Sequence, residues 1–70
     1  MQNDILKSLG EKLREIRNSK GLSQSMLAND ANIPKNQIGR IERGEISAGI
    51  NTLYKICQAL DIKVKDLIDF

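Results

Sequence analysis

Apolar residues recur at intervals of three and four along the first twenty positions of the chain. The residues in this pattern are Leu6, Leu9, Leu13 and Ile16. This is the period of one face of an α-helix. The pattern stops at Gly21, a residue that readily takes the left-handed conformation that closes a helix. The spacing predicts a helix over about residues 4–19, with Asn3 or Asp4 as its cap.

Two shorter helices follow, separated by a tight turn. Ser23 can cap the first of them, whose apolar face consists of Leu27, Ala28 and Ala31. Asn32 can adopt a positive φ, and Pro34 suits the first position of the next helix because its missing N–H is not needed there. A turn of about three residues makes the two helices cross steeply.

The remaining chain predicts three helical segments and no strand. One helix covers about residues 35–43, ends at Gly44 and has only Ile38 and Ile41 as large apolar residues. A further helix carries Leu53, Ile56, Cys57 and Leu60, and a short last one carries Val64, Leu67 and Ile68. No stretch alternates apolar and polar residues as a strand does. We therefore expect an all-α, compact five-helix unit that forms a single domain over residues 1–70.

Composition narrows the possible functions. The 70 residues include 11 Lys and Arg, 9 Asp and Glu, no His and one cysteine, Cys57. Without His or a second Cys there is no common metal site, no internal disulfide and no plausible nucleophile–base pair, so we expect neither an enzyme nor a cofactor. The apolar runs are too short for a membrane span. The lone Cys57 suits a reducing cytoplasm. Its helical neighbours indicate that Cys57 is a core residue rather than a redox switch.

The segment from Gln24 to Arg43 meets the physical requirements of a helix-turn-helix. A small residue, Ala28, stands where the two helices approach, and apolar anchors stand beside the turn at Ile33 and on the following helix. The motifs Gly21-Leu22-Ser23-Gln24, Leu27-Ala28 and Ile38-Gly39-Arg40-Ile41-Glu42-Arg43-Gly44 resemble the lambda-repressor-like, Cro-like (XRE-type) helix-turn-helix family over about residues 6–69. Asn32 stands where many members of this family have Gly. Pro34 stands where a capping Ser or Thr is usual. The resemblance implies a DNA-binding domain whose helix-turn-helix is formed by helices two and three.

The polar side of the 35–43 helix is the candidate DNA-reading surface. At about 100° per residue, burial of Ile38 and Ile41 turns the polar residues outward, with Gln37 at the margin. Arg40 can donate two hydrogen bonds to guanine, and Asn36 can pair bidentately with adenine. The predicted base-contacting residues are Lys35, Asn36, Gln37, Gly39 and Arg40. The alternative to DNA contact is that these residues form a merely solvated helix face. Gly39, inside the helix, is either a point of close approach to DNA or an exposed position that tolerates glycine.

Other polar residues are candidates for contact with the DNA backbone. The resemblance places Gln24 against a phosphate, helped by the positive end of the helix dipole. Ser23 is a phosphate candidate for which capping is the better interpretation. Arg43 and the loop residue Ser47 complete the predicted phosphate-contacting set, although the loop could be a plain connection.

A structural ion pair is predicted between Arg17 and Glu42. Arg17 lies at the edge of the apolar stripe of its helix, and Glu42 flanks Ile38. Both side chains are therefore expected to be partly buried, and a desolvated Arg and carboxylate require each other. The resemblance implies the same bridge, so Glu42 is interpreted as structural rather than catalytic.

One module of this size buries only about 600–1,000 Å² of its own surface on DNA, which favours a two-fold dimer on a near-palindromic operator. The candidate dimer interface is apolar and consists of Ile46, Ile50, Val64, Ile68 and Phe70. These observations predict a sequence-specific transcriptional regulator, either a repressor or a restriction-modification controller, with RNA polymerase as a possible partner and no small-molecule ligand. The alternative is an antitoxin-like protein-interaction module built on the same fold.

Overall fold

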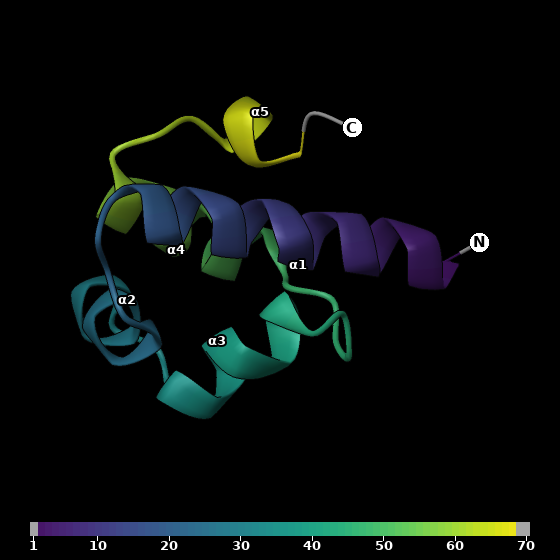
Figure 1. Cartoon of the computed structure of the whole chain (residues 1–70), viewed down its shortest axis with the longest axis horizontal. Coiled ribbons are helices and arrows are strands. Elements are labelled where there is room, and N and C mark those ends of the chain that lie inside the picture. Colours follow the sequence, from purple (N-terminus) through teal and green to yellow (C-terminus); the bar gives the residue numbers. More distant parts are fainter. Residues whose placement is uncertain (1, 69–70) are drawn as a thin grey trace.

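Helix α1 (Gln2–Ser19) crosses the middle of the molecule, with α3 on one side and α5 on the other (Figure 1). This computed structural model describes residues 2–68. Its helices are α1, α2 (Gln24–Ala31), α3 (Lys35–Glu42), α4 (Ile50–Leu60) and α5 (Val64–Leu67). No strand occurs among the described residues, so the predicted all-α, five-helix architecture is confirmed. None of these helices is both long and apolar enough to cross a membrane.

The start of α1 differs from the sequence prediction. The helix begins at Gln2, so residues 3 and 4 lie within its first turn and neither is the cap. No Gly or Pro stands before Leu6 to stop the helix from extending toward the N-terminus. Asp4 still favours this helix end, because a negative charge in the first turn complements the positive end of the helix dipole.

The turn between α2 and α3 has the predicted chemistry, apart from the position of Pro34. The Ser23 hydroxyl oxygen accepts a hydrogen bond from the Met26 N–H at 3.0 Å and so caps α2. Asn32 closes α2 in the left-handed conformation, with φ 59° and ψ 47°. Pro34 is the N-cap of α3 rather than its first helical residue, because its ψ of 141° is extended. In Figure 1, α2 is seen nearly along its axis while α3 lies across the view, which confirms the steep crossing.

The core lies where the apolar faces of the helices meet. The fully buried side chains with the largest volumes come from all five helices. They are Leu13, Leu27, Ile38, Ile41, Ile56, Leu60, Leu67 and Cys57. Every one of these residues belongs to a face that the apolar spacing predicts. The core therefore fixes which side of α3 remains free.

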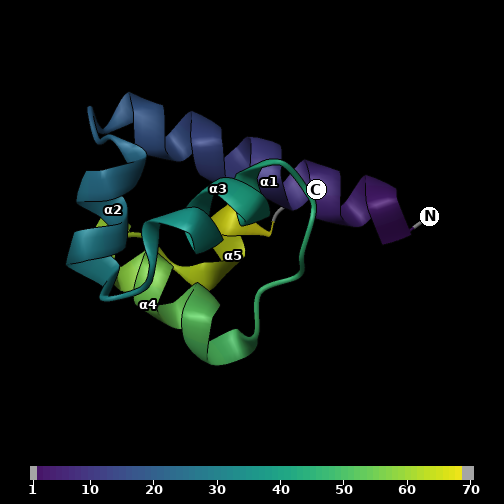
Figure 2. The ribbon, with the colours of Figure 1, turned by 90° about the horizontal axis from the view of Figure 1, so that it is seen from below.

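A close approach of two backbones sets the position of α3 on α1. Gly10 is buried, and a Cβ added there would lie 2.4 Å from the carbonyl oxygen of Ile41 and 2.5 Å from that of Glu42. Figure 2 shows the segment after α3 passing beside α1. A Cβ added at Gly44, in this segment, would lie 3.1 Å from Cα of Lys7. Gly44 has a φ of +72°, which favours glycine in any case. The C-terminal end of α3 is thus held directly against the α1 backbone.

The predicted ion pair between Arg17 and Glu42 is present and ties α1 to α3. Nε of Arg17 donates to Oε2 of Glu42 at 2.6 Å, and Nη2 donates to Oε1 at 3.1 Å. The third guanidinium nitrogen, Nη1, donates to the Leu22 carbonyl at 2.7 Å. Both side chains are almost wholly buried, with exposed fractions of 10% and 3%. A bidentate pair that is also bonded to the backbone fixes the orientation of α3 about its own axis.

Candidate nucleic-acid interface

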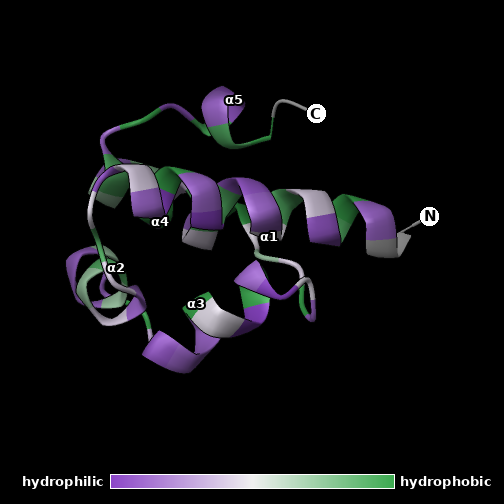
Figure 3. Cartoon of the chain, viewed as in Figure 1, coloured by the Kyte–Doolittle hydropathy of each residue, from purple (hydrophilic) through white to green (hydrophobic). Residues whose placement is uncertain are grey.

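Helix α3 places its apolar residues inward and its polar residues outward. Ile38 and Ile41 are fully buried, whereas Lys35, Asn36 and Arg40 are exposed. We call these three exposed residues the outer face of α3. Figure 3 shows the first turn of α3 as hydrophilic, at the edge of the molecule away from α1. A helix held by a buried side and carrying donors on its exposed side has the shape and chemistry that the major groove accepts.

Gln37 and Gly39 are less accessible than the outer face. Gln37 is half-buried, as its marginal position predicts. Gly39 is buried, so the expectation of an exposed position there is wrong. The reason is the long side chain of Arg43, one turn later. A Cβ added at Gly39 would lie 3.0 Å from Nη1 of Arg43 and 3.6 Å from Oε1 of Gln24. In the free protein the space that Gly39 leaves is therefore next to the protein's own side chains.

Arg40 of α3 and Arg43, the C-cap of α3, meet one carboxylate in the segment that follows the helix. Nε of Arg43 donates to Oε2 of Glu45 at 2.6 Å, and Nη2 lies 3.4 Å from Oε1. Nε of Arg40 lies 3.6 Å from Oε1 of the same carboxylate. The hydrogen bond from Arg43 is the main cause that lowers the pKa of Glu45, and Glu45 in turn raises the pKa of Arg43. Glu45 is therefore an anion at neutral pH.

Sequence reasoning missed Glu45. The available signal was the opposite charge two residues after Arg43, across the helix-ending Gly44. This signal was weak, because charged neighbours on a solvated loop are common and most do not pair. The three side chains remain about half exposed, so the pairing leaves both arginines within reach of a ligand.

The start of α2 and the loop after α3 hold the other predicted phosphate contacts. The Ser23 hydroxyl is engaged as the cap. Nε2 of Gln24 donates to Oε1 of Glu42 at 3.0 Å, which joins Gln24 to the buried ion pair. Ser47 is exposed in the loop between α3 and α4. The first backbone N–H groups of α2 are oriented out of the helix end, where an anion is favoured.

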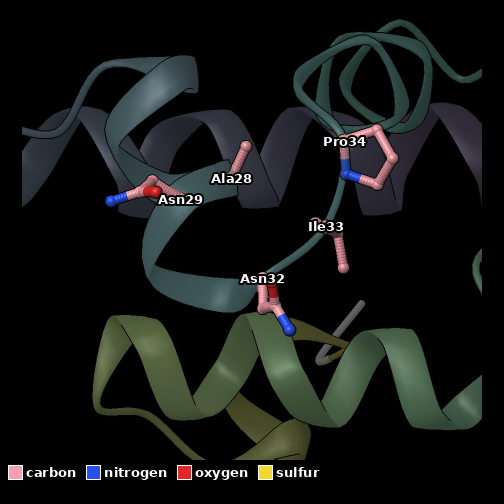
Figure 4. Close-up of a pocket in the computed structure, with 5 residues that line it drawn as sticks. All are labelled: Ala28, Asn29, Asn32, Ile33 and Pro34. Carbon is pink, nitrogen blue, oxygen red and sulfur yellow. The ribbon is translucent and has the colours of Figure 1, made fainter.

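An open hollow lies beside the turn. It has a volume of about 300 Å³ and is lined by Ala28, Asn29, Asn32, Ile33 and Pro34 (Figure 4). None of these side chains titrates or carries a charge. The charged chemistry of this region therefore belongs to α3 and the segment after it, not to the hollow.

The predicted dimer interface is only partly available. Ile50 and Ile68 are exposed, with exposed fractions of 68% and 46%. Ile46 and Val64 are half-buried and pack against the protein's own core, so less of their apolar surface is free than the sequence suggested. Phe70 lies outside the described residues.

Tyr54 is an exposed apolar residue that the sequence analysis did not single out. It stands one turn after Ile50 on α4, with an exposed fraction of 57%, and its hydroxyl accepts a hydrogen bond from Nε2 of Gln58 at 3.1 Å. The spacing of four residues from Ile50 could have indicated a shared helix face. Together the two residues make the start of α4 an exposed apolar patch.

Comparisons with known proteins agree with this geometry. The helix-turn-helix family model matches residues 13–67. The control protein C.BamHI of Bacillus amyloliquefaciens is 39% identical over 71 aligned positions, which cover 100% of this chain and 88% of that protein. The transcriptional regulator SinR of Bacillus subtilis is 34% identical over 87% of this chain and 56% of its own length.

The fold agrees equally well with a solved structure. The crystal structure of the restriction-modification controller protein C.AhdI from Aeromonas hydrophila superposes with a TM-score of 0.87 at 37% identity, over 89% of this chain and 94% of that one. The sequence resemblance is therefore confirmed. The chain belongs to the helix-turn-helix family and is a DNA-binding transcriptional regulator rather than an enzyme.

Proposed function

We propose that the chain binds an operator in double-stranded DNA as a two-fold dimer, with α3 inserted into the major groove. The observation that carries this proposal is the outer face of α3, where Lys35, Asn36 and Arg40 are exposed while Ile38 and Ile41 hold the helix from behind. Side chains on a fixed helix reach base edges in a more precisely defined register than side chains on a loop do.

Each residue of the outer face has a proposed role that follows from its chemistry. Arg40 donates two hydrogen bonds to O6 and N7 of guanine, and Asn36 pairs with N6 and N7 of adenine. Lys35, at the start of α3, reaches a guanine or a phosphate. Gln37 contacts a base from the margin of the face. Gly39 makes a base contact only when the Arg43 side chain has moved off it.

Phosphate contacts set the register of the protein on the duplex without reading sequence. Arg43 supplies one from the end of α3, and Ser47 supplies another from the loop that follows. Gln24 and Ser23 lie at the start of α2, where the helix dipole favours an anion. The Ser23 hydroxyl accepts from the Met26 N–H, so its own O–H can still donate to a phosphate. The side-chain amide of Gln24 donates to Glu42, so Gln24 contacts the phosphate through its backbone N–H.

The dimer would place two copies of α3 in successive major grooves about 34 Å apart. The exposed apolar residues Ile50 and Ile68 support an interface, with Ile46 and Val64 at its border and Phe70 as a further candidate. Sedimentation at micromolar concentration tests this directly. Monomer alone, with and without an inverted-repeat duplex, would reject the dimer.

The biological role that we infer is control of transcription in the cytoplasm, as a repressor or as a restriction-modification controller. Similarity to C.BamHI and C.AhdI over most of the chain supports the controller. A controller or repressor acts by occluding or contacting RNA polymerase, which is the proposed protein partner. The exposed apolar patch at Ile50 and Tyr54 is the feature that would favour a protein-interaction module instead.

Binding to duplex DNA across a salt series tests the proposal. Fluorescence anisotropy of a labelled duplex should show affinity that falls linearly with salt on a double-logarithmic plot, because phosphate contacts release counterions. Arg40→Ala should weaken binding, and Lys55→Ala, which removes one positive charge from the exposed side of α4, should not. A flat response near zero affinity would contradict DNA binding and favour the protein-interaction module.

A further inference from the structure

Glu45 occupies a position that the proposed contacts do not use. Its carboxylate lies 2.6 Å from Nε of Arg43 and 3.6 Å from Nε of Arg40, so one acidic side chain faces one cation in α3 and one at its C-cap. The same pairing holds Arg43 where its guanidinium would meet a Cβ at Gly39. Both arginines are candidates for contact with DNA, and DNA would have to displace Glu45 to bind them fully.

We propose that Glu45 forms an autoinhibitory contact: its carboxylate competes with DNA for Arg40 and Arg43, and so weakens binding to operator and unrelated DNA alike. This inference rests on the proposed function. Glu45 acts against DNA binding, whereas each DNA contact proposed above strengthens it.

The local charge supports this competition. The segment from residue 35 to residue 45 has three cations, Lys35, Arg40 and Arg43, and two acids, Glu42 and Glu45. Glu42 is buried and paired with Arg17, so its charge is compensated inside the protein. Glu45 is therefore the acid of this segment that faces solvent beside the arginines. A phosphate that approaches Arg43 meets a carboxylate already bonded to it.

The cost of displacing Glu45 falls on operator and unrelated DNA alike. Exposed ion pairs of this kind change an equilibrium by no more than about fivefold each. The free protein holds the pair and each complex gives it up, so the same factor enters both affinities. The preference of Arg40 for guanine, which discriminates between bases by roughly 5- to 150-fold, is left unchanged. Glu45 thus lowers the affinity for DNA without changing the ratio of operator affinity to random affinity.

The position of Gly39 gives Glu45 a second effect on the same face. While Glu45 holds Arg43, the guanidinium lies against the surface of α3 at Gly39. When Arg43 moves to a phosphate, that surface becomes accessible to a base or sugar. The contact predicted at Gly39 is then available only in the complex, after Arg43 has exchanged Glu45 for DNA.

Glu45→Gln tests the inference, because it keeps the size of the side chain and removes its charge. Glu15→Gln is the matched control: Glu15 is an exposed residue of α1 that makes no ion pair within the described residues, and the change in net charge is the same. Affinity is measured by anisotropy for a random duplex and for the duplex that the wild-type protein enriches from a random pool. Circular dichroism checks that both variants remain folded.

We expect Glu45→Gln to strengthen binding to both duplexes by about two- to fivefold, with a steeper salt dependence than that of the wild-type protein. Glu15→Gln should change both affinities much less. Unchanged or weaker binding of the Glu45→Gln variant to either duplex, or an equal gain from Glu15→Gln, would overturn the inference. Failure of the proposed function itself is a different result, since the wild-type protein would then bind neither duplex.

Discussion

Arg17 and Glu42 are the charged residues that the described part of the chain buries. Their pairing is a condition of the fold, because neither charge could remain in the core alone. We predict that Arg17→Met lowers the free energy of unfolding by about 3–5 kcal/mol, since Glu42 would keep only the hydrogen bond from Gln24. Urea denaturation followed by circular dichroism measures this loss.

A paired replacement separates the stranded charge from lost packing. If the uncompensated carboxylate is the cause, Arg17→Met combined with Glu42→Leu should recover much of the lost stability. A single Arg17→Met variant as stable as the wild-type protein would contradict this account of the ion pair.

Gly10 is the residue where α1 and α3 come closest. Because its Cβ would lie 2.4 Å from a carbonyl oxygen, Gly10→Ala should destabilise the protein by about 1–3 kcal/mol, although alanine favours a helix. Gly49→Ala is the control for the clash, since a Cβ there would meet nothing within 4 Å at a φ of −67°. Because Gly49 is the N-cap of α4, where alanine is less favoured, this control should lose no more than about 1 kcal/mol. Thermal unfolding compares the two variants. A stabilised Gly10→Ala protein would show that the helices can separate without cost.

At the scale of whole elements, α4 ends less favourably than α2. Asp61 closes α4 in the left-handed conformation, with φ 57°, and places a negative charge at the negative end of the helix dipole. Asp61→Asn keeps a residue that tolerates this conformation and removes the charge, so it should stabilise the protein by about 0.3–1 kcal/mol at low salt. The gain should shrink in 1 M salt. A gain that is independent of salt would assign the effect to the backbone instead.

The helices and turns were predictable because their signals are local. Apolar spacing indicated all five helices, and Asn32 and Gly21 marked two turns that the structure places at positive φ. The start of α1 and the exact position of Pro34 were wrong, since helix ends depend on weak preferences that several neighbouring residues satisfy.

The candidate site was predictable only in part. The outer face of α3 followed from two buried isoleucines. The burial of Gly39 and the role of Glu45 depend on where the long side chain of Arg43 folds, and the approach at Gly10 depends on the packing of two helices. Helical periodicity contains no information on the path of the Arg43 side chain or on how closely α1 and α3 pack. These residues therefore appear only when the elements are assembled.

At the scale of the whole molecule, Cys57 reports on the integrity of the core. The thiol is buried, and desolvation, with a smaller effect from the charge of Asp66, raises its pKa. A raised pKa means less thiolate at pH 7, and only the thiolate reacts. We predict that iodoacetamide labels the native protein at least about a thousandfold more slowly than the protein in urea at the same pH, because labelling requires unfolding. Equal rates would contradict a closed core.

The central claim is that the outer face of α3 reads bases, and selection of bound sites from a random duplex pool tests it most directly. The wild-type protein should enrich an inverted repeat with half-site centres about one helical turn apart. Asn36→Ala should enrich the same repeat with relaxed preference at one base pair in each half-site, because a single bidentate contact is lost. Enrichment of no sequence by the wild-type protein, or of an unchanged motif by the Asn36→Ala variant, would contradict the account.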